Sequence, residues 1–315
     1  MQNIEQTVVI LGTGGTIAGM AKNASDNVGY SAAQIGVAQL LAAVPALAGQ
    51  ALEAEQVSQI DSKDMGFVVW RGLALRVAHH LARPEVAGIV ITHGTDTLEE
   101  TAYFLQRVLA PAKPVVLTAA MRPATALLAD GPQNLLDAVT VARSAGASGV
   151  VAVLAGEVHS GLEVRKRHTY RLAAFGSGDA GPIAQVEEAR LRLHRPWPQS
   201  AAVGVDRLPE DVAQWPRVEI VTSCAGSGAG IVAALRRIGV HGVVVAGTGN
   251  GSVHHDLEVA LLEAQLAGVR VVRSSRCLVG AVIASAGQAL PSAGALTPAQ
   301  ARVETILALL EAGSP

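Results

Sequence analysis

The sequence of 315 residues is poor in aromatic residues, in cysteine and in net charge. Phe, Trp and Tyr make up only 3% of it, so Val, Ile, Leu and Ala must supply any core. Two cysteines, Cys224 and Cys277, are too few for a disulfide framework or a cysteine-rich zinc site. A formal charge of −2 argues against a nucleic-acid partner, because a broad nucleic-acid surface needs an excess of Lys and Arg.

Long apolar runs are also missing. No stretch approaches the roughly 20 residues that a helix needs to cross a bilayer. Residues 1–6 show neither the basic region nor the apolar region of a signal peptide, and Val8–Leu11 already has the character of a core strand. We therefore expect a cytoplasmic protein with no membrane partner.

What the sequence does contain is a regular alternation of short apolar runs and helical stretches. The runs are apolar throughout, which is typical of parallel strands covered on both faces. Strands are expected at Val8–Leu11, Val57–Ile60, Gly88–Thr92, Val115–Thr118, Val150–Leu154, Val218–Thr222, Val243–Ala246 and Val269–Arg273, and helices at Ala33–Ala43, Val69–Leu81, Leu98–Leu109, Gln133–Ser144, Ala229–Ile238 and Asp256–Leu266. This order predicts an α/β fold with right-handed crossovers.

The alternation breaks at residues 191–215, where several prolines lie among scattered charges. We interpret this stretch as a linker between two domains. Residues 1–190 would form a catalytic domain with a parallel sheet of the flavodoxin or Rossmann type. Residues 216–315 would form a smaller C-terminal α/β domain.

A glycine-lined turn, Gly12–Gly19, follows the first strand. A dinucleotide-binding fingerprint would need glycine where Ile17 stands, and a P-loop would need a lysine that is absent. Two hydroxyls remain, those of Thr13 and Thr16, on a turn whose glycines allow a ligand close to the backbone. The alternative is a tight strand-to-helix turn without chemistry.

A second polar turn, His93–Thr97, follows the strand Gly88–Thr92. It places the hydroxyl of Thr95 beside the carboxylate of Asp96 at a strand end, where α/β sheets bind ligands. Thr97 and Glu100 match a capping box, so the positive end of a helix would face the same place and favour an anion or oxyanion. The alternative is that these are only helix-start residues.

The remaining polar features are weaker. The loop Asp61–Met65 and the basic cluster Arg165–His168 are, by themselves, most simply solvated charges. The pair His79–His80 has no partner at metal-ligand spacing, and His254 is expected to cap a helix or to be solvated. Cys224 is expected to be a small core residue. The sequence therefore predicts no metal site.

Two long segments, Gly14–Gly19 and Ile91–Ala102, together resemble the signatures of bacterial-type L-asparaginases. The resemblance continues through Ala120–Pro123, Asp130–Leu135, Arg273–Arg276 and Ala301–Val303. It implies a large N-terminal domain, a linker, a smaller C-terminal domain and no cofactor. It also implies a homotetramer, a dimer of dimers, in which the C-terminal domain of one subunit completes the site of its neighbour.

The resemblance also implies roles for individual residues. Thr16 matches the primary nucleophile, and the residues alone do not separate its role in the first attack from that of Thr95. Tyr30 matches the lid tyrosine that hydrogen-bonds Thr16, and residues 20–29, directly before Tyr30, are expected to form a mobile lid. Thr95, Lys166 and Asp96 match a Thr-Lys-Asp proton relay. The reaction would be attack of a threonine hydroxyl on a small amide, loss of ammonia, and hydrolysis of the acyl-enzyme.

The substrate-binding residues follow from the same resemblance, with one departure. Ser62 and Asp96 match the groups that hold the substrate α-carboxylate and α-amino group, and Ser252 lies where the family has Asn or Ser. Lys63, however, stands where the family commonly has Gln or Glu, and the segment Gly280–Gln288 lacks the carboxylate expected there. Lys63 would repel the substrate ammonium unless it turns to solvent.

We therefore expect an amidohydrolase that converts L-asparagine to L-aspartate and ammonia. One alternative keeps the chemistry but uses a small linear amide that lacks a free α-amino group or bears a further carboxylate near Lys63. A second alternative is a catalytically silent protein that binds an amino acid.

Overall fold

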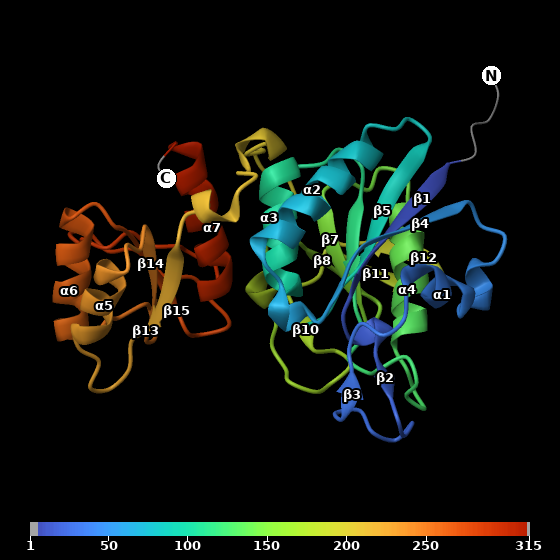
Figure 1. Cartoon of the computed structure of the whole chain (residues 1–315), viewed down its shortest axis with the longest axis horizontal. Coiled ribbons are helices and arrows are strands. Elements are labelled where there is room, and N and C mark those ends of the chain that lie inside the picture. Colours follow the sequence, from blue (N-terminus) through green and yellow to red (C-terminus); the bar gives the residue numbers. More distant parts are fainter. Residues whose placement is uncertain (1–5, 314–315) are drawn as a thin grey trace. The chain divides into compact units, whose positions relative to one another are not determined.

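The computed structural model describes residues 6–313 and divides the chain into two compact units, Met1–Val205 (unit 1) and Asp206–Pro315 (unit 2). Unit 1 is built on an eight-stranded sheet with the order β12-β11-β8-β7-β6-β5-β1-β4 (Figure 1). Its strands are β1 (Thr7–Gly14), β4 (Leu52–Ile60), β5 (Val86–Thr92), β6 (Val115–Thr118), β7 (Val150–Leu154), β8 (Glu157–Ser160), β11 (Ala184–Glu187) and β12 (Arg190–Leu193).

Five neighbouring strands of this sheet, β4, β1, β5, β6 and β7, are parallel. Numbered along the chain, their order is 2-1-3-4-5, which is the flavodoxin type. The expected α/β fold is therefore confirmed. Strands β8, β11 and β12 are antiparallel additions at one edge that the apolar pattern does not predict, and β12 lies at the start of the expected linker.

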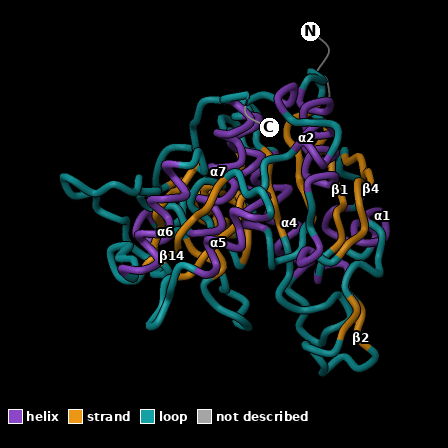
Figure 2. Tube along the Cα trace, turned by 60° about the vertical axis from the view of Figure 1, so that its left-hand side comes forward, coloured by secondary structure: helices purple, strands orange, loops and turns teal. Residues whose placement is uncertain are grey.

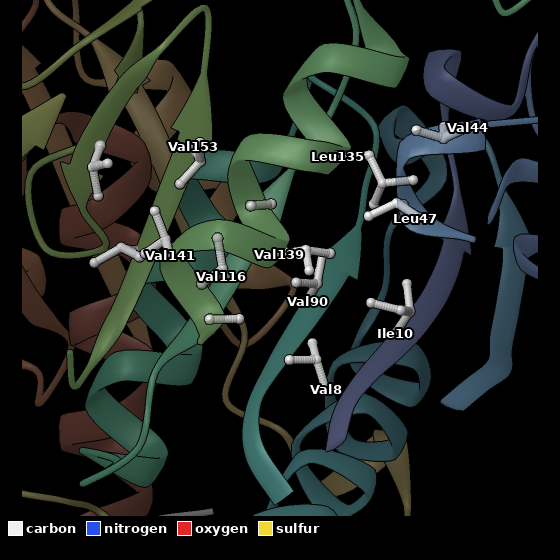
Figure 3. Packing of buried hydrophobic residues seen from close by; sticks show 14 of the residues in the cluster. Val8, Ile10, Val44, Leu47, Val90, Val116, Leu135, Val139, Val141 and Val153 are labelled. Carbon is white, nitrogen blue, oxygen red and sulfur yellow. The ribbon is translucent and has the colours of Figure 1, made fainter. Parts of the chain in front are cut away.

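Helices cover both faces of the sheet in unit 1. They are α1 (Val37–Ala42), α2 (Phe67–Leu81), α3 (Leu98–Leu109) and α4 (Gly131–Ala142), with short 3₁₀ turns η1 (Thr16–Ala18), η2 (Pro45–Leu47), η3 (Ser62–Asp64) and η4 (Gly178–Ala180). Helices α1 and α4 share one face, where Val8, Ile10 and Val90 of the strands meet Leu135 and Val139 of α4 (Figure 3). On the other face α2 contacts α3, and the Trp70 and Phe104 rings stack at 4.8 Å.

One crossover departs from the expected right hand. The connection β1–α1–β4 moves one way across the sheet, whereas β6–α4–β7 moves the opposite way with its helix on the same face. These two connections therefore have opposite hands. Because β4–α2–β5 and β5–α3–β6 share the hand of the first, β6–α4–β7 is the exception, and the expectation of uniform right-handed crossovers is wrong there.

Two small hairpins stand apart from the main sheet of unit 1. Strands β2 (Met20–Ala21) and β3 (Tyr30–Ser31) form one, and β9 (Arg165–Lys166) and β10 (Phe175–Gly176) form the other. The β2–β3 hairpin projects away from the sheet (Figures 1 and 2). Each hairpin carries a residue that the sequence places in the site, Tyr30 in the first and Lys166 in the second.

Unit 2 is a parallel three-stranded sheet in the order β13-β14-β15, flanked by helices. Its elements are β13 (Val218–Thr222), α5 (Gly230–Arg237), β14 (Gly242–Gly247), α6 (His255–Leu266), β15 (Arg270–Ser275) and α7 (Pro298–Glu311). The 3₁₀ turn η5 (Val205–Arg207) spans the boundary with unit 1, and η6 (Val212–Gln214) follows it. Thr297 and Gln300 form a reciprocal capping box at α7. His254 caps α6, as expected. Within residues 6–313, no helix is both long and apolar enough to cross a membrane.

Candidate active site

The site begins where two polar turns touch each other through their backbones. Gly15 follows β1 and Gly94 follows β5, and these strands are neighbours in the sheet. A Cβ atom on Gly15 would lie 2.3 Å from the Cα of Gly94, and Gly15 has a φ of 80°. Glycine is required here on both counts. The contact places the next residue of each turn, Thr16 and Thr95, at the switch point of the sheet.

A third loop, after β4, packs against the same place. A Cβ atom on Gly94 would lie 2.3 Å from the Oγ atom of Ser62, which is buried. The backbone N–H of Asp96 donates to this Oγ at 3.2 Å, and the hydroxyl of Thr97 donates to the Ser62 carbonyl at 2.8 Å. Thr97 therefore makes no side-chain capping bond to α3, and the expected capping box is wrong.

The two hydroxyls of the first turn have different partners. The Oγ1 of Thr16 lies 2.6 Å from the phenolic oxygen of Tyr30, and Thr16 is 7% exposed. The hydroxyl of Thr13 instead donates to the carbonyl of Thr92 at 3.0 Å, which ties β1 to β5. Thr13 is therefore a structural residue, and Thr16 alone presents its hydroxyl toward the lid tyrosine.

Lys166 joins the two polar residues of the second turn. Its ammonium donates to the Oγ1 of Thr95 at 2.8 Å and to the Oδ1 of Asp96 at 2.7 Å. The Asp96 side chain is 53% exposed and the Lys166 side chain 21%. A cavity of about 420 Å³ opens beside both of them and is also lined by Arg167, His168 and Thr169. The structure thus brings together the three residues of the expected relay.

Glu99 holds the relay lysine by its backbone, a contact that sequence reasoning missed. The N–H of Lys166 donates to the Oε2 of Glu99 at 2.6 Å. Glu99 belongs to the first turn of α3, directly after Thr95 and Asp96. It therefore ties the β9–β10 hairpin to the turn that carries the other two relay groups. In the sequence, the signal for Glu99 is its place in the family signature Ile91–Ala102.

Lys63 lies in η3, next to Ser62, and forms an ion pair with Asp61. The distance from its Nζ to the Oδ2 of Asp61 is 2.9 Å, and its side chain is 65% exposed. The hydrogen bond and charge of Asp61, followed by the charges of Asp64 and Asp96, raise the pKa of Lys63 above its usual value. Lys63 therefore stays charged at neutral pH and is partly neutralised by its neighbour.

His93 stabilises the second turn by a hydrogen bond between its side chain and the backbone. It is fully buried, and its Nδ1 lies 2.7 Å from the carbonyl of Gly94, so Nδ1 carries the proton. Burial lowers the pKa of His93 to about 4. Its Nε2 has no hydrogen-bond partner among the described residues. His93 is therefore a neutral residue that fixes the backbone beside Thr95.

The remaining candidates lie in unit 2. Ser252 is exposed in the turn after β14, where its backbone pairs with that of Thr248 at 2.8 Å, and its role stays a prediction. Cys224 is exposed, because it lies in the turn beyond the end of β13, so its expected place in the core is wrong. Among residues 6–313, no group of three or more His, Cys, Asp or Glu side chains is arranged to hold a metal ion.

Most of the chain matches two family models in order. Residues 7–199 match the model "Asparaginase, N-terminal", and residues 217–315 match the "Glutaminase/Asparaginase C-terminal domain". The chain belongs to the asparaginase family. Its resemblance to bacterial-type asparaginases is thereby confirmed.

Individual relatives within the asparaginase family agree with these matches. A glutaminase-asparaginase of Pseudomonas fluorescens biotype A is 40% identical over 279 residues, which cover 88% of this chain and 77% of that protein. L-asparaginase 2 of Escherichia coli K12 is 38% identical, over 98% of this chain and 90% of that protein. The crystal structure of a probable cytoplasmic L-asparaginase from Campylobacter jejuni superposes with a TM-score of 0.90 at 38% identity, covering 96% of this chain and 95% of that one.

The contact between the two glycine turns gives a first prediction for this family member. Replacing Gly15 by Ala would place a Cβ atom against the Gly94 backbone at a positive φ, so the turns must separate. We expect G15A to lower the free energy of unfolding by about 2 kcal/mol or more and to disturb the site. Urea denaturation followed by circular dichroism measures this loss.

The matched control is Gly72, which lies in α2 with open space where a Cβ would point. We expect G72A to leave stability unchanged or to raise it by up to about 1 kcal/mol, since alanine favours helices. Equal unfolding midpoints for G15A and the wild-type protein would contradict the close contact described above.

Proposed function

We propose that this chain is an L-asparaginase that hydrolyses L-asparagine to L-aspartate and ammonia. The observation that carries the proposal is the pair of separately partnered threonines at the switch point. Thr16 is hydrogen-bonded to Tyr30, and Thr95 is hydrogen-bonded to Lys166, which also pairs with Asp96. The names of its relatives support the same activity.

In the first half of the proposed reaction, the Oγ1 of Thr16 attacks the side-chain amide carbon. Its proton passes toward Tyr30, whose oxygen lies 2.6 Å away, and from there to the departing nitrogen. The C–N bond breaks, ammonia leaves, and an aspartyl ester of Thr16 remains. Backbone N–H groups near Thr95 are assigned to the oxyanion that forms on the amide oxygen.

In the second half, water hydrolyses this ester. Thr95 and Lys166 lie in hydrogen-bond contact and are assigned to remove a proton from the water, with Asp96 orienting the lysine. Lys166 acts in this step as the neutral amine, after loss of one ammonium proton to solvent, and accepts the Thr95 proton as Thr95 accepts that of the water. The proton returns to the Thr16 oxygen as the ester bond breaks, and L-aspartate departs. Asp96 has a second task in this proposal, because its half-exposed carboxylate can also hold the substrate ammonium.

Ser62 and the open face of Asp96 are assigned to substrate binding. The Oγ of Ser62 accepts the Asp96 N–H, so its own proton stays free to donate to a substrate carboxylate. Ser252, from a C-terminal domain, is proposed as a further substrate contact. As the resemblance to asparaginases implies, the proposed reaction uses no cofactor.

Ammonia release from L-asparagine tests the proposal. We expect the wild-type protein to release ammonia and T16A to lose about 10³-fold or more in kcat, since the attacking group is gone. The control is T13V, because Thr13 lies in the same turn but donates its hydroxyl to the backbone. T13V should keep turnover within about threefold while losing some stability. Full activity of T16A would show that the nucleophile is another residue. Absence of ammonia from the wild-type protein would favour the alternative of a catalytically silent protein that binds an amino acid.

The identity of the amide depends on Lys63. The sequence alone predicts that K63Q raises kcat/KM for L-asparagine at least tenfold. The ion pair with Asp61 changes that expectation, because the lysine already has a negatively charged partner outside the substrate-binding residues. We therefore expect K63Q to change kcat/KM by only about threefold or less, in line with an exposed pair.

Three variants, K63Q, D61N and D61N/K63Q, distinguish L-asparagine from an amide without a free α-amino group as the substrate. D61N removes the partner of Lys63, so it should lower kcat/KM for L-asparagine several-fold, and D61N/K63Q should restore it. Succinamate, which lacks the α-amino group, should respond to none of these changes. A tenfold gain in K63Q, or better turnover of succinamate than of L-asparagine by the wild-type protein, would instead favour the alternative amide substrate.

Assembly and location are further proposals. We propose a homotetramer in which a C-terminal domain closes a neighbour's site, and a cytoplasmic location like that in the description of the Campylobacter jejuni protein. Light scattering at assay concentration tests the first, and an active monomer would contradict it. Cell fractionation tests the second, and recovery in the periplasm would contradict it.

A further inference from the structure

The β2–β3 hairpin, which carries Tyr30, is hydrogen-bonded to a loop from a distant part of the chain. This loop, residues 121–130, connects β6 to α4 and so belongs to the crossover of exceptional hand. It runs beside the hairpin, and the two project together from the sheet (Figure 1). Two of its backbone N–H groups reach the hairpin segment: Ala124 donates to the Gly19 carbonyl at 2.9 Å and Leu127 to that of Ala24 at 3.1 Å.

Thr125 adds a side-chain contact between them. Its Oγ1 accepts the N–H of Ala21 at 2.8 Å and can donate to the carbonyl of the same residue at 3.4 Å. Ala21 is the residue paired with Tyr30 across the hairpin. Tyr30 in turn lies 2.6 Å from the Oγ1 of Thr16. A short chain of contacts therefore leads from Thr125 through one backbone pair to the proposed nucleophile.

The loop is a firm support because its base is fixed. The carboxylate of Asp130 accepts the N–H groups of Met121 and Arg122, at 2.9 and 3.0 Å. The side-chain amide of Asn134, in α4, donates to the Ala119 carbonyl at 2.9 Å. These bonds hold both ends of the loop on α4 and β6. Thr125 is thus presented to the hairpin by a loop whose base is hydrogen-bonded to α4 and to the end of β6.

The hairpin itself has only two residues in each strand, and an isolated two-stranded hairpin is marginally stable. Its tip is organised internally: the Asp26 carboxylate accepts the N–H groups of Val28 and Gly29, which also lowers the pKa of Asp26. Contacts from the loop, including the bond between Thr125 and Ala21, therefore help to keep Tyr30 on Thr16.

We propose that Thr125 is a positioning residue that holds the hairpin closed and thereby keeps Tyr30 on Thr16. The proposal rests on the proposed function, in which Tyr30 takes the proton of Thr16. Thr125 itself touches no reacting atom. Its hydroxyl acts through the backbone of Ala21.

The test compares T125V, which keeps the shape but loses the hydroxyl, with T125S, which keeps the hydroxyl. We expect T125V to lower kcat for L-asparagine about tenfold with the melting temperature little changed, and T125S to stay within about threefold of wild type. The control is S25A, since within residues 6–313 the Ser25 hydroxyl bonds Asn23 alone, in the exposed tip. S25A should match wild type.

Hydrogen exchange gives a second readout that needs no substrate. Amides of residues 20–31 should exchange faster in T125V than in wild type, while those of α3 (Leu98–Leu109) should not change. Hydrogen exchange needs no turnover, so it tests the role of Thr125 separately from the proposed function. Absence of ammonia from the wild-type protein would contradict the proposed function alone. Unchanged exchange in T125V sinks the role of Thr125.

A double variant shows whether Thr125 acts through Tyr30. If it does, T125V should change kcat by less than about twofold in a Y30F background, because the group it positions is already lost. Full additivity of the two substitutions, or wild-type kcat in T125V, would overturn the proposal. Should T125V fail to fold, T125A read by the same exchange and double-variant measurements keeps these outcomes open to test.

Discussion

Everything in the proposed site depends on one backbone contact, the approach of Gly15 to Gly94. Neither glycine leaves room for a Cβ atom, and Gly94 also packs against the Ser62 hydroxyl. Three loops that follow β1, β4 and β5 are thereby locked at one sheet edge, at the point where the strand order reverses. This contact places one threonine on each of two turns, Thr16 and Thr95, and the proposed reaction depends on these two residues.

The two threonines are served by two separate hairpins. Tyr30 reaches Thr16 from the β2–β3 hairpin, and Lys166 reaches Thr95 from the β9–β10 hairpin. Glu99 and Thr125 stand behind these contacts, the first on the backbone of Lys166 and the second on the backbone opposite Tyr30. The carboxyl ends of β1 and β5 therefore hold the two threonines, while two short hairpins bring Tyr30 and Lys166, the groups that take part in proton transfer with them. This division suits a site that must admit a substrate and then close over it.

Much of this could be predicted from the sequence where local patterns decide the outcome. The bounds of β6, β7 and α3 agree with the apolar pattern, since buried parallel strands and amphipathic helices carry strong periodicities. The antiparallel strands β8, β11 and β12 and the hand of the β6–α4–β7 crossover depend on long-range pairing, which leaves no local signal. The same holds for Thr97, whose hydroxyl bonds Ser62 rather than capping α3, and for the partner of Lys63. The contacts of Tyr30 and Lys166 came from the family resemblance, not from their spacing.

The most direct test of the account is to find where the acyl group is attached. In a T95V variant, the proposed activation of water is lost while Thr16 and Tyr30 remain, so the aspartyl ester should accumulate. Rapid acid quenching after mixing with L-asparagine, followed by peptide mapping by mass spectrometry, locates it. The account predicts the ester on Thr16, together with a burst of about one ammonia per site. An ester on another residue, or a burst of ammonia with Thr16 unmodified, would contradict it.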